Sequence, residues 1–168
     1  MKTFAIVVAS MLAILPATAQ SHGPMDIMIK HWQTSRDFTL AVADAMPADS
    51  YSFKPNPEEM SFGEVMEQVA RANGNYFSHL TGVKNPISKP ANFDKDTVMK
   101  ELADSFDFCT KTLQGLTPDQ LHAMSGPEGH QMSGLEWILA GFIHTAHHRG
   151  QAEVYLRVKN IKPPAYKF

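Results

Sequence analysis

Three histidines and a glutamine lie within about two helical turns near the C-terminus, in the stretch HTAHHRGQ at residues 144–151. His144 and His148 are four residues apart, so in an α-helix their rings lie one above the other on the same face. This spacing allows two imidazole nitrogens to bind one metal ion at about 2.0–2.1 Å, as in the helical zinc motif HExxH. Thr145 stands where that motif has its glutamate base. His147 points about 60° away from His144, so we expect it at the rim of the site.

A metal site is not the only structure that this helix could form. At 100° per residue, His144, His148 and Gln151 share an arc of about 60° with Trp137 and Tyr155. The three polar residues therefore take positions that face the other helices, where leucine would be expected. Burying such groups without partners costs about 1–3 kcal/mol each. Either a metal or hydrogen bonds to facing helices would offset this cost, and the spacing alone leaves both alternatives open.

The rest of the chain must provide the helices that face this one. Four long segments carry apolar residues at helical spacing, and none shows sustained strand alternation. The expected helices run from about Pro24 to Ala45, from Ser61 to Thr81, from about Asp94 to Gly115 and from Ser133 to about Lys159. Residues 117–124 read as a short helical turn and 125–132 as a loop. Antiparallel helices with one longer connector predict an all-α, up-down four-helix bundle.

Two local signals refine the last helix. Ser133 is followed three residues later by Glu136, which is a capping box, and Ser61 with Glu64 forms the same pattern at the start of the second helix. Gly150 falls inside the last helix, where glycine costs about 1 kcal/mol relative to alanine. It therefore indicates a close contact with another helix.

The first 19 residues have the three parts of a secretory signal peptide. Lys2 gives a basic start, residues 4–15 are almost unbroken apolar sequence, and Ala17-Thr18-Ala19 forms a small-x-small end. The apolar run is shorter than the roughly 20 residues that a membrane-spanning helix needs. We expect cleavage after Ala19, which leaves residues 20–168 as a single exported domain, periplasmic or secreted.

Charge and cysteine content narrow the classes of function. The net charge is −2, and loss of Lys2 with the signal peptide makes the mature chain more negative, so we expect no nucleic-acid partner. No other stretch is apolar enough to span a bilayer, so we expect no stable membrane insertion after cleavage. Cys109 is the only cysteine, which rules out an intrachain disulfide. Its apolar neighbours predict a buried, unreactive thiol.

Three stretches resemble one known family. The sequence HTAHHRGQAEVYLRVKNIKPP at 144–164 resembles the C-terminal helix and tail of the DinB-like proteins, which are four-helix bundles named after damage-inducible genes. SFGEVMEQVARAN at 61–73 resembles the start of their second helix, and YSFKPNPEEMSFG at 51–63 resembles their first connector. The resemblance covers nearly all of the mature chain and implies the same fold. It also implies homodimers, which bundles of this family often form.

The resemblance implies a metal site with one altered ligand. Members of the family typically bind a divalent metal ion, often zinc or nickel, through three histidines, two of which match His144 and His148. The third lies in a pattern like FGExxxHxA on the second helix, where this sequence has Gln68. A neutral amide oxygen is a poor substitute for imidazole on zinc. His31 in the first helix and Glu64, one turn before Gln68, are the other candidates for the third ligand.

Two functions of different classes follow from the resemblance. The first is an exported metal-binding bundle that acts on an unknown small molecule as a metal-dependent enzyme of the thiol-transferase or hydrolase type, because a metal lowers the pKa of a bound thiol or water. The second is a non-catalytic binding or assembly module that has lost the metal because Gln68 replaces the third histidine. The sequence specifies neither the substrate nor the reaction.

Overall fold

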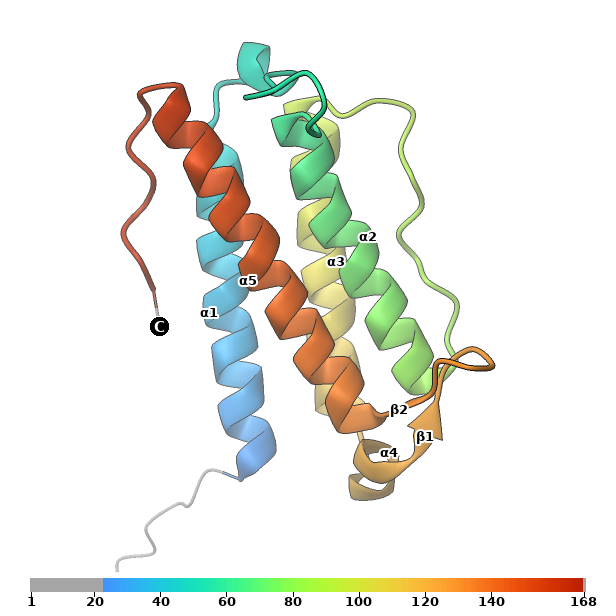
Figure 1. Ribbon diagram of the computed structural model, residues 1–168. Helices are drawn as coiled ribbons and strands as arrows, with labels where there is room; N and C mark the ends of the chain where they lie inside the picture. The colour runs from blue at the N-terminus through green and yellow to red at the C-terminus, as the bar shows by residue number, and fades with distance from the viewer. Residues whose placement is uncertain (1–22, 168) are drawn as a thin grey trace, which may run out of the picture.

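Four long helices form a bundle in the computed structural model, which describes residues 23–167 (Figure 1). They are α1 (Pro24–Ala45), α2 (Phe62–Thr81), α3 (Lys95–Gly115) and α5 (Gly134–Val158). The connections hold a 3₁₀ turn, η1 (Ala48–Ser50), a short helix, α4 (Pro118–His122), and two strands, β1 (Met124–Ser125) and β2 (Met132–Ser133). The predicted all-α class is confirmed. The predicted signal peptide, residues 1–19, lies outside the described residues.

The predicted helix starts are confirmed by their capping contacts. The Ser61 hydroxyl accepts a hydrogen bond from the Glu64 N–H, and the Glu64 carboxylate accepts one from the Ser61 N–H at 2.7 Å. Ser133 and Glu136 make the same reciprocal pair at the start of α5. These bonds satisfy backbone donors that a helix leaves free in its first turn. Local sequence therefore sets where α2 and α5 begin.

The order of helix directions differs from the predicted up-down arrangement, because α2 and α3 run parallel (Figure 1). Gly63 at the start of α2 lies against Phe93, just before α3, while Leu80 near the end of α2 lies beside Gly134, after α3 has ended. The 13 residues 82–94 cross the whole bundle between the two helices. An extended chain of that length spans about 43 Å, which exceeds the roughly 30 Å length of α2. A connector of this length can therefore cross rather than turn back.

The core is formed where all four long helices meet. α2 packs against α3 and α5, and α1 packs against the same two helices from the other side. The fully buried Trp32 of α1 is at its centre, with ring centroids 5.0 Å from Phe77, 5.2 Å from Phe106 and 4.9 Å from Phe142. Cys109 is fully buried, and burial raises the pKa of its thiol, as the sequence predicted. No described helix combines the length and apolar character needed to cross a membrane.

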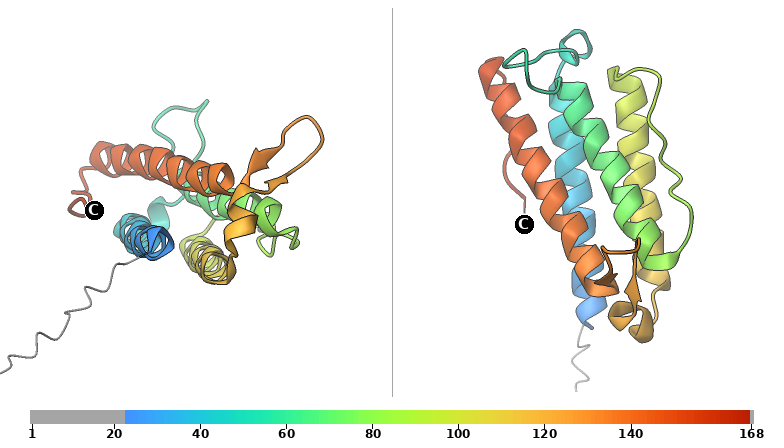
Figure 2. Two further views of the ribbon diagram at one scale, coloured as in Figure 1. Left: turned by 90° about the horizontal axis from the view of Figure 1, so that it is seen from below. Right: turned by 45° about the vertical axis from the view of Figure 1, so that its right-hand side comes forward.

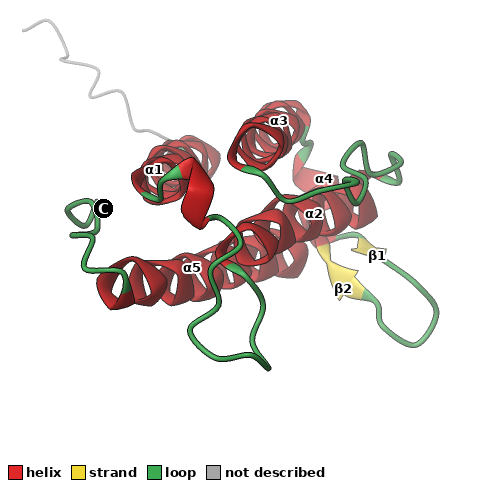
Figure 3. Ribbon diagram, turned by 90° about the horizontal axis from the view of Figure 1, so that it is seen from above, coloured by secondary structure: helices red, strands yellow, loops and turns green. Residues whose placement is uncertain are grey.

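Two projections flank the outer side of α2 and α5. The connector between α1 and α2 extends at one end of the bundle, and the hairpin of β1 and β2, which the sequence predicted as loop, extends at the other (Figures 2 and 3). The connector is held by a 3.0 Å hydrogen bond from the Tyr155 hydroxyl to the Met60 carbonyl, and the hairpin by a 3.1 Å bond from the Trp137 indole N–H to the Ser125 carbonyl. The histidine-rich part of α5 lies between these two anchors.

Candidate metal site between α2 and α5

The two predicted metal-ligating histidines lie side by side on α5. The ring centroids of His144 and His148 are 4.4 Å apart, with the ring planes inclined at 60°. Both side chains are half-buried rather than fully buried. Trp137 and Tyr155, which the sequence placed in the same row as the histidines, are buried as predicted. The centre of the buried face, however, follows Gly141, Thr145 and Ala152. Because α5 packs against both α1 and α2, its buried face is centred between them, and the histidines lie at the edge facing α2.

A chain of hydrogen bonds orients the ring of His148. Its Nδ1 lies 3.0 Å from the Oε1 of Gln151, whose Nε2 donates to the Tyr155 hydroxyl at 3.3 Å. The Tyr155 hydroxyl donates in turn to the Met60 carbonyl, so it must accept from an amide N–H. This order of donors and acceptors fixes the orientation of the Gln151 amide, with its oxygen toward His148. Because that oxygen can only accept, Nδ1 of His148 carries the hydrogen between them. The lone pair on Nε2 is left for a ligand, as in metal-binding histidines held by an outer hydrogen bond.

His144 is neutral at neutral pH. Burial, followed by the charges of His148, His147 and Arg71, lowers the pKa of its imidazole from 6.5 to about 4. Its Nδ1 is buried and has no hydrogen-bond partner among the described residues. The ring of Tyr76 on α2 stands edge-on at 5.6 Å. A neutral imidazole keeps a lone pair, so His144 meets the first requirement of a metal ligand.

Gln68 lies on α2 at about the level of His148. Because α2 and α5 run antiparallel, two contacts mark how they are aligned. Tyr76 contacts His144, and Met60, just before α2, contacts Tyr155, so Gln68 lies between these two contacts along α2. This places Gln68 on the stretch of α2 that passes His148, but within residues 23–167 no hydrogen bond joins Gln68 to either histidine.

The amide oxygen of Gln68 already has a partner. The Arg71 guanidinium donates a hydrogen bond to Gln68 Oε1. Its Nε also donates to Glu67 Oε1 at 3.1 Å, and the carboxylate of Glu67 is almost fully buried. The Gln68 oxygen that would ligate a metal cation thus already accepts a hydrogen bond from the cationic side chain of Arg71. Neither contact of Arg71 is among the sequence predictions, although the four-residue spacing of Glu67 and Arg71 indicates their ion pair.

The two other candidates for a third ligand lie elsewhere. The Glu64 carboxylate caps the start of α2, and its hydrogen bonds with Ser61 lower the pKa of Glu64. His31 lines a cavity of about 160 Å³ beside Arg149 and Tyr166, on the side of α5 that faces α1. Neither side chain faces His144 and His148 in this structure.

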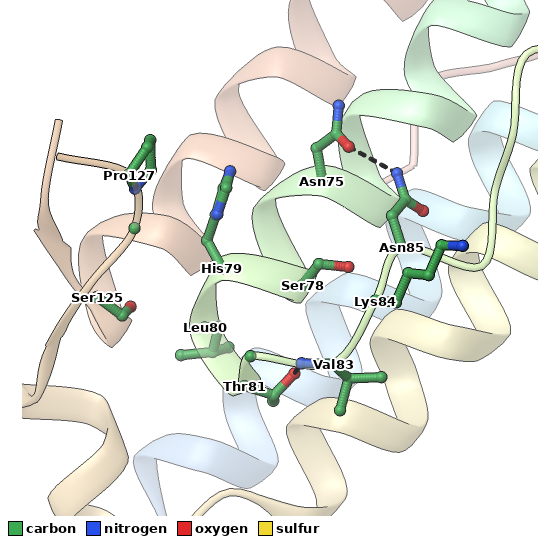
Figure 4. A pocket seen from close by; sticks show the side chains of 12 residues that line it. Asn75, Ser78, His79, Leu80, Thr81, Val83, Lys84, Asn85, Ser125 and Pro127 are labelled. Carbon is green, nitrogen blue, oxygen red and sulfur yellow. Dashed lines mark hydrogen bonds between the residues drawn. The ribbon is translucent and has the colours of Figure 1, made fainter.

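His147 and His79 lie outside the pair. His147 is exposed, with its ring centroid 4.9 Å from that of His148, which is the predicted rim position. His79 stacks on Trp137 at 4.7 Å, near the end of α2. There it lines a cavity of about 740 Å³ together with Ser125, and the Asn75–Asn85 hydrogen bond spans another part of the wall (Figure 4). This cavity is separate from the histidine pair.

The donor set fits a divalent ion in part. Between residues 23 and 167 no group of three or more His, Cys, Asp or Glu side chains is placed to hold a metal ion. His144 and His148 supply two imidazoles, and the Nδ1 of His148 is held by Gln151. Gln68 does not act as a donor while Arg71 holds its oxygen. The arrangement is a two-imidazole site with a guanidinium at its edge.

Comparisons with known proteins place this bundle in a family. The family model described as the DinB superfamily matches residues 31–152. The uncharacterized protein YjoA of Bacillus subtilis (strain 168) is 24% identical over an alignment of 136 residues, which covers 77% of this chain and 87% of YjoA.

Two solved structures are similar to this one. A DinB-like protein from Bacillus cereus ATCC 10987 superposes with a TM-score of 0.74 at 20% identity, covering 83% of this chain and 95% of that one. The YjoA structure from Bacillus subtilis superposes with a TM-score of 0.71 at 20% identity, covering 83% and 96%. These two matches show the fold, and the family model covers most of the chain. The chain therefore belongs to the DinB superfamily.

Proposed function

We propose that this protein is an exported DinB-superfamily bundle that binds a divalent metal ion, zinc or nickel, through His144 and His148. The observation that carries the proposal is the hydrogen-bond chain from His148 through Gln151 and Tyr155 to the Met60 carbonyl. It fixes the tautomer and the ring direction of His148 beside a neutral His144. Such outer hydrogen bonds are typical of histidines that ligate metals.

The metal would be held more weakly than in a three-histidine site. Two imidazoles remain, and Gln68 becomes a third donor only if its oxygen leaves Arg71. The positive charge of Arg71 also disfavours a divalent cation nearby, as it disfavours the protonated form of His144. A bound divalent ion would supply a Lewis acid with open positions for a small-molecule thiol or a water.

The residues around the pair would serve binding rather than proton transfer. Gln151 and Tyr155 would hold His148 in place, while Arg71 would attract an anionic group of a small molecule to the histidine pair. If such a site is catalytic, its reaction belongs to the thiol-transferase or hydrolase type. An exported protein would not meet a cytosolic thiol cosubstrate, which favours hydrolysis over thiol transfer.

A second candidate function is a non-catalytic binding module without a resident metal. The observation that favours it is the hydrogen bond from Arg71 to Gln68. It occupies the oxygen that would bind a metal and holds a positive charge beside it. In that case Arg71, beside the two histidines, would attract a small anionic ligand. Export applies to both candidate functions. The mass of the mature protein tests the predicted cleavage, because the mature chain should begin at Gln20.

Elemental analysis of the purified mature protein separates the two candidates. The parent is compared with the His144→Ala/His148→Ala double variant and with Arg71→Met, after incubation with zinc or nickel and removal of excess ion. Near-stoichiometric metal in the parent, lost in the double variant, supports the metal site. No metal in the parent but metal in Arg71→Met supports the binding module and identifies Arg71 as the cause. No metal in any of the three proteins would contradict the metal proposal.

A further inference from the structure

A small cavity lies between α1, α5 and the C-terminal tail, on the side of α5 that faces α1. The tail runs back beside these two helices after α5 has ended (Figures 1 and 3). The cavity has a volume of about 160 Å³, and its polar lining includes His31 and Ser35 of α1, Arg149 of α5, and Tyr166 and Lys167 of the tail. No aspartate or glutamate is among the described residues that line it. Its charged lining is therefore basic.

The guanidinium of Arg149 is the only one in the described chain without a carboxylate partner. Arg36, Arg71 and Arg157 each form an ion pair with an aspartate or a glutamate. None of the ion pairs among the described residues includes Arg149. Glu153, one turn further along α5, pairs with Arg157 at 3.6 Å. Because Arg149 is half-buried and buried charges are normally paired, we expect an anion beside it.

Neutral groups of α1 hold the Arg149 side chain in place. Its Nη1 donates hydrogen bonds to Ser35 Oγ at 3.0 Å and to Thr39 Oγ1 at 3.3 Å. The guanidinium carbon lies 4.5 Å from the ring centroid of Phe38, and the ring of Tyr166 stands edge-on to Phe38 at 5.8 Å. The guanidinium is thus oriented before any ligand binds, which lowers the entropy cost of binding.

These contacts leave one edge of the guanidinium free. No described residue accepts a hydrogen bond from Nε or Nη2 of Arg149. The N–H groups of these two nitrogens form a fork that can bind two oxygens of one carboxylate or phosphate. The Ser35 hydroxyl adds a donor, because it accepts from Arg149 and its own hydrogen has no acceptor in the described chain. Thr39 differs, since its hydroxyl donates to the Ser35 carbonyl at 2.7 Å.

We propose that this cavity binds a small oxyanion, a carboxylate or a phosphate, through the Nε and Nη2 edge of Arg149. The Ser35 hydroxyl and the Lys167 ammonium are placed to bind the remaining oxygens. The cavity is smaller than the roughly 300 Å³ at which sites for drug-sized ligands begin, so the ligand is small. The site does not rest on the proposed metal, because its groups come from α1, the tail and the side of α5 that faces α1.

Isothermal titration calorimetry of the mature protein tests the site. Metal is first removed with a chelator, the chelator is dialysed away, and phosphate, acetate and chloride are each titrated at the same ionic strength. Phosphate or acetate should bind with a dissociation constant of about 1 mM or tighter, and chloride should bind more weakly. Binding of phosphate alone identifies a phosphate site, binding of acetate alone a carboxylate site, and binding of both a general oxyanion site. Binding of neither anion above the chloride level would overturn the proposal.

Arg149→Met and Arg71→Met are matched variants that separate this site from the histidine pair. Arg149→Met removes the fork but keeps an apolar stem beside Phe38, so it should weaken oxyanion binding about tenfold or more. Arg71→Met removes the guanidinium beside the histidines and should keep the affinity. Equal affinities of Arg149→Met and the parent would contradict the site. Loss of binding in Arg71→Met alone would overturn it and place the anion beside His144 and His148.

Three milder variants keep the test decisive if Arg149→Met does not fold. Arg149→Lys keeps the charge without the fork and should also weaken binding. Lys167→Gln changes an exposed residue of the tail and should weaken binding about threefold. Gly150→Ala is the control in α5: contrary to the sequence prediction, no close helix contact is present there, because a Cβ would meet nothing within 4 Å. This variant should keep the affinity, and unchanged affinity in both lysine-site variants, Arg149→Lys and Lys167→Gln, would contradict the proposal.

Discussion

The Arg71 guanidinium donates a hydrogen bond to the amide oxygen of Gln68, at the position where the family resemblance implies a histidine ligand. The substitution thus does more than remove an imidazole. It provides an acceptor for a cation that Glu67 already holds in place. Metal affinity at His144 and His148 should therefore depend on the charge and reach of Arg71 as much as on residue 68.

Gln68→His should raise the affinity for zinc about tenfold, which corresponds to about 1.4 kcal/mol. The reason is that an imidazole nitrogen binds zinc more strongly than an amide oxygen does. Isothermal titration with a competing chelator measures the change, and Gln114→His on the exposed end of α3 is the control for nonspecific histidine binding. Unchanged affinity in Gln68→His would show that residue 68 does not face the bound ion.

Gln151→Leu should lower the affinity for zinc by roughly tenfold or more, because it removes the acceptor that holds Nδ1–H of His148. Gln151→Glu keeps an acceptor at the same position and should retain most of the affinity. Circular dichroism of both variants establishes that α5 is intact. Equal affinities of Gln151→Leu and the parent would mean that the hydrogen-bond chain does not position the ligand.

The stability of the metal-free protein should fall as pH falls from about 6.5 to about 4. Burial holds the pKa of His144 at about 4 in the folded chain, below its ordinary 6.5. The unfolded chain therefore binds more protons across that window, and the free energy of unfolding decreases as protons are added. His144→Asn should lose about 1 kcal/mol less than the parent between pH 7 and pH 4.5, allowing for its partial exposure. Urea unfolding in EDTA measures both, with exposed His122→Gln expected to behave like the parent.

Glu101→Gln should stabilise the protein at pH 7. Burial, then the charges of Glu67 and Asp104, raises the pKa of Glu101, and one of its carboxylate oxygens is buried with no described partner. A raised folded pKa means that stability is lost as pH rises, so neutralising this group should add up to about 0.5 kcal/mol at pH 7, after a discount for solvent screening of its exposed part. The gain should vanish below about pH 4, where carboxylates are protonated. Glu128→Gln in the exposed hairpin loop serves as control, and a destabilised Glu101→Gln at pH 7 would contradict the reasoning.

The helices and the histidine pair could be predicted from the sequence because their causes are local. The capping boxes at Ser61 and Ser133 specify helix starts within three residues. The four-residue spacing of His144 and His148 places their rings on one face wherever the helix packs. The sequence could equally indicate the ion pair of Glu67 and Arg71, which depends on the same spacing within one helix.

The relations between helices were decided only by the tertiary structure. The 13 residues 82–94 could turn back or cross the bundle, and only packing makes α2 parallel to α3. Which face of α5 is buried depends on contact with both α1 and α2. Periodicity alone placed His144 and His148 within the buried face, whereas they lie at its edge. His31 has a suitable side chain, yet α1 turns it to the other side of α5. Sequence spacing determines which residues share a face, whereas long-range packing determines what that face meets.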